Sequence, residues 1–299
     1  MNTNEYVSLF FDFVNKVKKT VCKVEGDDII PMHQANQDWD PLDPANRERL
    51  LSMTWNVSAS TWAGVEKNST YTQTMAVLIE RLLKLTDISN RKLRILSLGS
   101  GPGLYEIFLA YWLRSIGRNA RMYSLDYSEG MVAFQNGLLS SDLRIDGVRV
   151  SALKEAVTPV LGNMEDLRKF YGGMDIVFCN NALQWVADWR AAVREMQLAL
   201  NENGPRTLVV VIHPNAMVVH VGDKLIEREL ITEEALFDEL EKHRIQPVFQ
   251  RYMIGNEGTG QAGGRLNRMF FEARFYPLGV SRSWREMSRP VGKATFVKL

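Results

Sequence analysis

The sequence contains little cysteine and no long apolar run. Its two cysteines, Cys22 and Cys179, are too few for a disulfide framework. Cys179 lies in an apolar segment where a buried thiol is expected, and a reducing, cytoplasmic environment is the expected location. Apolar runs such as residues 208–212 are far shorter than the ~20 residues that a membrane span needs. The first residues lack the uninterrupted apolar core of a signal peptide, so neither a membrane anchor nor secretion is expected.

The sequence also lacks a charge excess and metal-binding patterns. Its 36 basic and 35 acidic residues leave a net charge of +1 at pH 7, so neither nucleic acid nor an anionic membrane is an expected partner. No histidine pair or cysteine cluster has the spacing of metal ligands, and no metal site is expected. A chain with 45% hydrophobic and 24% charged residues is typical of a soluble globular protein.

The most informative stretch is residues 94–105, where a short apolar segment runs into three alternating glycines. Ile95, Leu96 and Leu98 suit a strand that is buried on both faces, as in a parallel sheet. Glycines let the backbone turn sharply and let a ligand approach closely. Residues 104–116 then show apolar side chains at helical spacing. The free N–H groups at the start of this helix would face the loop and could hold a negatively charged ligand group.

A second strand, residues 122–125, ends at Asp126, which lies 23 residues after Gly103. An acidic residue at this distance and at a strand tip is placed to accept hydrogen bonds from ribose hydroxyls. The glycine spacing is G-x-G-x-G, with Leu104 next, and therefore differs from the dinucleotide fingerprint G-x-G-x-x-G. The pattern predicts a nucleoside ligand at the switch point of an open α/β sheet.

Strand and helix patterns alternate along the rest of the chain, which predicts a doubly wound α/β fold with a mostly parallel, seven-stranded sheet. The last two strands follow each other without a helix and are expected to be an antiparallel edge pair. The expected strands are 94–98, 121–125, a weak one near 148–152, 174–179, 206–213, 247–254 and 268–277, and the most regular helices are 104–116, 189–200 and 232–243.

The N-terminal part, residues 1–70, is expected to be a helical extension before the main domain, residues 71–280, and a basic tail, residues 281–299. Residues 1–25 carry apolar side chains at helical spacing. This amphipathic helix is expected to cover its own domain; the alternatives are a lid over the active site or packing on a partner subunit, which would make a homo-oligomer. The tail is either a solvated face or a site for an anionic substrate.

Four stretches in order resemble the motifs of class I S-adenosylmethionine-dependent methyltransferases: residues 96–103, 125–131, 162–167 and 175–186. The last stretch, with its Asn-Ala-x-x-Gln-Trp, is most similar to small-molecule members such as trans-aconitate and malonyl-carrier-protein methyltransferases. The resemblance spans roughly residues 70–280. It implies a Rossmann-like methyltransferase fold, S-adenosylmethionine as cofactor and a small-molecule acceptor. It departs from the family at Ser97, where an acidic residue is common.

The resemblance also implies roles for individual residues. The glycine loop would approach the methionine and ribose portions, and Asp126 would bind the ribose hydroxyls. Tyr127 and Met131 would flank the adenine, and Asn163 would contact its amino group. The main-chain carbonyl of Asn180 would accept a hydrogen bond from the amino group of the methionine portion. The complete set of expected cofactor-binding residues is Gly99, Ser100, Gly101, Gly103, Asp126, Tyr127, Met131, Asn163, Met164 and Asn180.

The catalytic side of the site is defined by fewer residues. Methyl transfer is a direct displacement, and alignment of the reactants can supply most of the catalysis. His213 follows an apolar strand and could act as a general base. Trp185 is expected to face the substrate, and Tyr71 to reach the cofactor or substrate; packing is the alternative role for each. The other functions left open are a scaffold without turnover and an RNA or protein methyltransferase.

Overall fold

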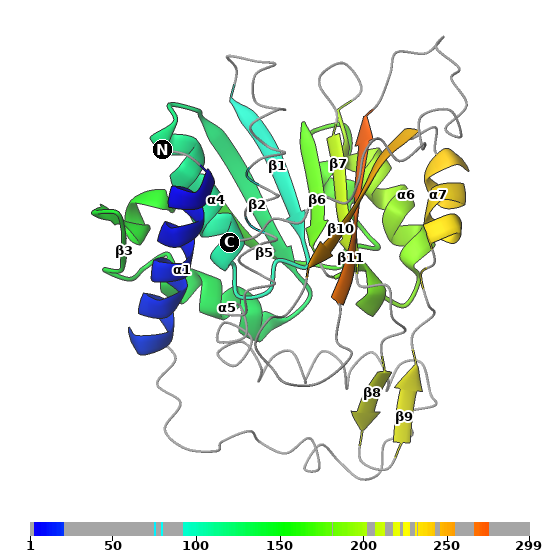
Figure 1. Ribbon diagram of the computed structural model, residues 1–299, viewed down its shortest axis with the longest axis horizontal. Coiled ribbons are helices and arrows are strands. Elements are labelled where there is room, and N and C mark those ends of the chain that lie inside the picture. Colours follow the sequence, from blue (N-terminus) through cyan, green and yellow to red (C-terminus); the bar gives the residue numbers. More distant parts are fainter. Residues whose placement is uncertain are drawn as a thin grey trace.

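The computed structural model describes residues 3–20, 75, 79, 92–180, 182–201, 207–212, 218–221, 224–227, 231, 233–242, 246–254 and 266–274. Their centre is a sheet with the strand order β10-β11-β7-β6-β1-β2-β5 (Figure 1). The bounds of its strands are β1 Leu93–Leu98, β2 Ala120–Asp126, β5 Val157–Leu161, β6 Ile176–Asn180, β7 Thr207–Ile212, β10 Gln246–Ile254 and β11 Leu266–Arg274.

The five strands β5, β2, β1, β6 and β7 are parallel to one another, whereas β11 pairs antiparallel with β7 and β10 pairs antiparallel with β11. The predicted mostly parallel sheet and the antiparallel pair at one edge are therefore confirmed. The chain passes from β1 to β2 and β5 on one side, and to β6 and β7 on the other. The direction of winding reverses beside β1, and open α/β sheets bind ligands at this switch point, at the carboxyl ends of the strands.

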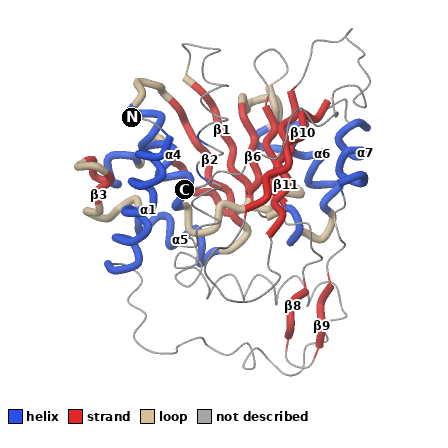
Figure 2. Tube along the Cα trace, viewed as in Figure 1, coloured by secondary structure: helices blue, strands red, loops and turns tan. Residues whose placement is uncertain are grey.

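The sheet separates two apolar cores because its side chains alternate between the two faces. Ile176 and Phe178 of β6 belong to the core under helices α1, Thr3–Thr20, and α4, Leu104–Ser115. Val177 and Cys179 belong to the core under α6, Trp189–Ala199, and α7, Glu233–Lys242. Figure 2 shows these helices on opposite sides of the strands, with α5, Glu129–Leu138, on the side of α4.

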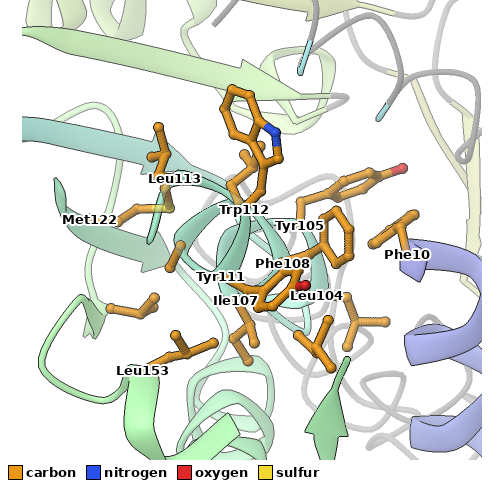
Figure 3. Packing of buried hydrophobic residues seen from close by; sticks show 14 of the residues in the cluster. Phe10, Leu104, Tyr105, Ile107, Phe108, Tyr111, Trp112, Leu113, Met122 and Leu153 are labelled. Atoms are coloured by element: carbon orange, nitrogen blue, oxygen red, sulfur yellow. The ribbon is translucent and has the colours of Figure 1, made fainter. Parts of the chain in front are cut away.

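The predicted N-terminal helix is present as α1 and packs on the domain that carries the glycine loop. Phe10 is fully buried; its ring is stacked on Tyr105, 5.2 Å between centroids, and meets Phe108 edge-on at the same distance. Tyr6 meets Trp112 edge-on at 6.0 Å. The aromatic side chains of α4 thus fill the space beneath α1 (Figure 3). The contacts of α1 favour the covering role.

The predicted strand near 148–152 is only partly observed: its first two residues form a strand, but this strand lies outside the main sheet. Asp146 and Gly147 both have positive φ and form a tight turn, so β3, Arg144–Ile145, pairs with β4, Val148–Arg149, in a small hairpin outside the main sheet. A 3-10 helix, η2, Val150–Leu153, follows. The third parallel strand is instead β5, which contains Pro159. Proline is tolerated there because β5 lies at the edge of the sheet.

The remaining described elements are short. The 3-10 helices η3, Arg168–Phe170, and η4, Leu183–Trp185, precede and follow β6, and a hairpin of β8, Val218–Val221, and β9, Lys224–Glu227, lies between β7 and α7. The basic tail, residues 281–299, lies outside the described residues. No described helix is both long and apolar enough to cross a membrane.

Candidate cofactor-binding site

The turn from β1 into α4 requires glycine for its backbone. Gly99, Gly101 and Gly103 have φ values of 62°, 57° and 76°, in the left-handed region that other residues rarely adopt. Gly103 is the N-cap of α4 and offers no side-chain cap to the helix. The turn lies at the carboxyl end of β1, beside the switch point of the sheet.

Two of these glycines are also required by packing. A Cβ built on Gly99 would lie 2.1 Å from the Cβ of Ala182, and a Cβ on Gly103 would lie 2.5 Å from Cγ of Gln135. The loop is therefore pressed between the segment after β6 and helix α5. Gly99 and Gly103 are thus needed because Ala182 and Gln135 pack closely against them, a requirement that the glycine spacing did not predict.

Asp126 joins the tip of β2 to the glycine loop. Its Oδ2 accepts a hydrogen bond from the main-chain amide of Gly101 at 2.7 Å, and its Oδ1 accepts one from the amide of Ser128 at 2.9 Å. The side chain is 8% exposed. Burial raises the pKa of Asp126 to about 6, although the amides of Ser128, Gly101 and Tyr127 act in the opposite direction. A carboxylate has about four acceptor sites, so the three amides leave one for a further donor.

Gln135 on α5 is a site residue that the sequence motifs did not identify. Its Nε2 donates to the carbonyl of Gly101 at 2.6 Å and lies 2.8 Å from Oγ of Ser100. The hydroxyl of Ser100 in turn lies 3.2 Å from the carbonyl of Leu125. These bonds tie the loop after β1 to β2 and α5. The only sequence signal is a polar residue on the otherwise apolar face of α5, where a buried amide must find partners.

Glu106 in the first turn of α4 is a second site residue outside the motifs. It is 2% exposed, and the hydroxyl of Ser97 donates to its Oε1 at 2.6 Å. Burial raises the pKa of Glu106 to about 7, with opposing contributions from the Ser97 hydroxyl and its own main-chain amide, and a further rise from the charge of Asp126. The helix start that was expected to hold an anionic ligand group thus has a carboxylate of the chain itself.

Three buried oxygen atoms near the carboxyl ends of β1, β2 and β6 have no hydrogen-bond partner among the described residues: Oε2 of Glu106, Oε1 of Gln135 and Oδ1 of Asn180. All three are acceptors, and unpaired buried acceptors cost free energy unless a ligand donates to them. The arrangement suits a ligand that carries N–H and O–H donors and positive charge. The amino group, ribose hydroxyls and sulfonium of S-adenosylmethionine meet this requirement, whereas the pyrophosphate of a dinucleotide would be repelled by the carboxylates.

The other expected cofactor residues differ in exposure. Tyr127, directly after Asp126, is 42% exposed, whereas Met131 is 2% exposed and Met164 is 7% exposed. Oδ1 of Asn163 accepts from the amide of Glu165 at 3.0 Å, and its Nδ2 donates to Oε2 of Glu165 at 2.9 Å. Of the two residues expected to flank the adenine, Tyr127 therefore offers an accessible ring and Met131 does not offer an accessible sulfur.

The candidate catalytic residues are only partly described. Trp185 is half-buried on η4, at the carboxyl end of β6, while His213 and Tyr71 lie outside the described residues. Burial raises the pKa of Cys179 to about 12, so this thiol is inert, as expected from its apolar segment. Within the described ranges, no group of three or more histidine, cysteine, aspartate or glutamate side chains could hold a metal ion.

Comparison with known proteins gives one family match, which covers part of the chain. Residues 96–206 match a family described as methyltransferase domain. No curated protein sequence matches the chain. The matched residues include the end of β1, the glycine loop, Asp126 and β6, so it is the part with the candidate site that matches a methyltransferase domain.

Solved structures share the fold at low sequence identity. The N1-methyltransferase of 1,6-didemethyltoxoflavin from Burkholderia thailandensis, solved with that compound and S-adenosylhomocysteine, is 18% identical with a TM-score of 0.55, and the match covers 78% of this chain and 91% of that one. A proposed methyltransferase of Haloferax volcanii, in complex with the activator Trm112, is 14% identical with a TM-score of 0.50. The match covers 74% of this chain and 96% of that one. A proposed S-adenosylmethionine-dependent methyltransferase of Methanococcus maripaludis is 13% identical with a TM-score of 0.50. The match covers 76% of this chain and 95% of that one.

These likenesses show a Rossmann-like methyltransferase fold. The expected Rossmann-like fold is thereby confirmed. The match of residues 96–206 to a methyltransferase domain supports the expected class of enzyme and its expected cofactor, S-adenosylmethionine.

Proposed function

We propose that this chain transfers the methyl group of S-adenosylmethionine to a small-molecule acceptor by direct displacement. The observation that carries the proposal is the buried carboxylate of Asp126, which is hydrogen-bonded to the glycine loop beside the switch point of the sheet. A carboxylate in this position suits the two hydroxyls of a ribose. When bound, the cofactor would supply an electrophilic methyl group on its positively charged sulfonium, and the leaving group would be a neutral thioether.

The chain's own contribution is to bind and orient. Asp126 holds the ribose, the exposed ring of Tyr127 stacks on the adenine, and Asn163 faces the adenine's amino group. The carbonyl of Asn180 accepts from the amino group of the methionine portion, and the loop 99–103 with Ser100 encloses that portion. Fixing both reactants in one geometry can lower the barrier by ~7–11 kcal/mol. No step in this scheme needs a metal ion.

The acceptor is expected to bind at the carboxyl end of the sheet, on the side where Trp185 lies. A half-buried indole offers a flat apolar face for a small organic molecule. His213 directly follows β7 in the sequence, and an imidazole is suited to take the proton that the acceptor loses. Tyr71 is the third residue of this proposed substrate side. The near-neutral charge of the chain and the likeness of residues 175–186 to small-molecule enzymes favour a metabolite over a macromolecule.

Calorimetry with S-adenosylmethionine tests the cofactor half of this proposal. Asp126→Ala should weaken binding by ~1–3 kcal/mol through the loss of charged hydrogen bonds. Asp175→Asn is the matched control, because Asp175 is a buried carboxylate that accepts from the amide of Arg94 at the opposite end of β1. Unchanged binding in Asp126→Ala, or equal loss in both variants, would contradict the assignment.

The acceptor is identified separately. The protein is incubated with methyl-labelled cofactor and a cell extract divided into metabolite, RNA and protein fractions, and the label is followed. Label in the metabolite fraction supports a small-molecule acceptor. Label in RNA or protein alone would overturn it, and no transfer to any fraction would favour a binding protein without turnover.

A further inference from the structure

Glu106 is a buried acid that none of the motifs explains. It lies in the first turn of α4, directly after the glycine loop, and its neighbour Ser97 lies two residues before that loop. The Ser97 hydroxyl donates to Oε1, while Oε2 is buried and has no partner in the part of the chain that the structure describes. A helix that needed only solubility or capping would not place a glutamate here, because a buried, half-satisfied carboxylate is costly.

The local charge is also uncompensated. Asp126 is the charged group that acts on Glu106 from the neighbouring strand, and both are acids. Among the described residues, the ion pairs involve Arg149, Arg168 and Lys242, and none reaches Glu106 or Asp126. Because no described cation neutralises these two buried acids, a positively charged group of a ligand could do so at this end of the sheet.

We propose that the Glu106 carboxylate, held by the Ser97 hydroxyl, binds the α-ammonium of the cofactor's amino-acid portion through its unpaired Oε2. This inference rests on the proposed function, since it assumes that S-adenosylmethionine lies along the glycine loop. An ammonium has three donors, so it can reach Glu106 and also the carbonyl of Asn180. The residue selects for the amino-acid half of the ligand, whereas Asp126 binds the nucleoside half.

Calorimetry with three ligands measures the contributions of the amino-acid half and the nucleoside half to binding separately. S-adenosylmethionine and S-adenosylhomocysteine both carry the ammonium, and 5′-methylthioadenosine has the nucleoside and thioether but no amino-acid portion. Glu106→Gln keeps the shape of the side chain and removes its charge. It should weaken the two amino-acid ligands by about 10- to 100-fold, the range of a charged hydrogen bond, and change 5′-methylthioadenosine by less than about twofold.

Ser97→Ala is the second variant, and it leaves the carboxylate in place but removes its fixed partner. It should weaken binding of the two amino-acid ligands by about three- to tenfold, a smaller loss than in Glu106→Gln, and leave the affinity for 5′-methylthioadenosine nearly unchanged. Asp175→Asn should leave all three affinities unchanged. If Glu106→Gln binds all three ligands as the wild type does, or loses all three equally, Glu106 does not bind the ammonium. If the wild type binds none of them, the proposed function itself fails, and the two failures are thereby distinguished.

Discussion

The side-chain amide of Gln135 donates to the main-chain carbonyl of Gly101 over 2.6 Å, although the two residues are 34 positions apart. The same nitrogen lies 2.8 Å from the hydroxyl of Ser100, and the Gln135 side chain occupies the space that a Cβ on Gly103 would need. The conformation of the loop is thus fixed from α5 as well as by its glycines. Cofactor binding should depend on a helix that does not itself belong to the loop.

Replacing Gln135 by methionine tests this dependence. The variant keeps the length of the side chain and removes its donors, so the carbonyl of Gly101 loses its buried partner. We expect the free energy of unfolding to fall by ~1–3 kcal/mol and the affinity for S-adenosylmethionine to fall as well. Urea denaturation and calorimetry measure the two effects. Asn136→Met, on the exposed side of α5, is the control, and equal behaviour of the two variants would contradict the role of Gln135.

Gly99→Ala should destabilise the protein through two separate costs. The left-handed φ of 62° costs a non-glycine residue ~1–2 kcal/mol, and the new Cβ would overlap Ala182, which adds ~1–3 kcal/mol. The double variant Gly99→Ala/Ala182→Gly should recover the packing cost and keep the backbone cost. Thermal unfolding of the single and double variants measures both. A double variant no more stable than the single one would show that the close approach is unimportant.

The buried acids should make the ligand-free protein less stable as the pH rises. The folded-state pKa of Glu106 is about 7 and that of Asp126 about 6, above their ordinary values of 4.5 and 3.8. The folded state therefore retains protons that the unfolded state has already lost, and stability from these groups decreases between about pH 4 and pH 7. At ~1.4 kcal/mol per pKa unit, the decrease in the free energy of unfolding that is due to Glu106 is on the order of 3 kcal/mol.

Urea denaturation from pH 5 to pH 8 measures this slope, and Glu106→Gln provides the comparison. The variant has no titrating group at this position, so its stability should decline less with rising pH than that of the wild type. Wild-type and variant curves that stay parallel over this range would show that Glu106 does not titrate between the folded and unfolded states.

Helix α1 should be an integral part of the domain. Phe10 is fully buried between α1 and α4, whereas the adjacent Phe11 is 42% exposed. Phe10→Ala should lower the free energy of unfolding by ~3–5 kcal/mol, as expected for the loss of a buried aromatic ring. Phe11→Ala should change it by less than ~0.5 kcal/mol. Chemical denaturation compares the two, and a small effect of Phe10→Ala would instead favour a helix that detaches or serves as a lid.

Elements with a strong local pattern could be predicted from the sequence. The apolar run of β1, the alternating glycines and the helical spacing of α4 each depend on neighbouring residues, and all three are observed. The edge strand β5 was missed because Pro159 argues against a strand, and the sequence does not reveal which strand lies at an edge.

The same limit applies to the site. Asp126 was found because its position at a strand tip can be read from the chain alone. Gln135 and Glu106 were not found, because their partners, Gly101 and Ser97, become neighbours only through packing of α5 and α4 on the sheet. The acidic residue that the family resemblance led us to expect at position 97 is absent, and the structure instead brings a carboxylate to Ser97 from the adjacent helix.

The most direct test of the central claim is a crystal structure of the protein with S-adenosylhomocysteine. We predict that the ribose hydroxyls lie within hydrogen-bonding distance, about 2.5–3.0 Å, of the Asp126 carboxylate, with the amino-acid portion along residues 99–103. A ligand bound away from Asp126 and the glycine loop, or a loop that stays closed against Ala182 and Gln135 without room for the ligand, would contradict this account.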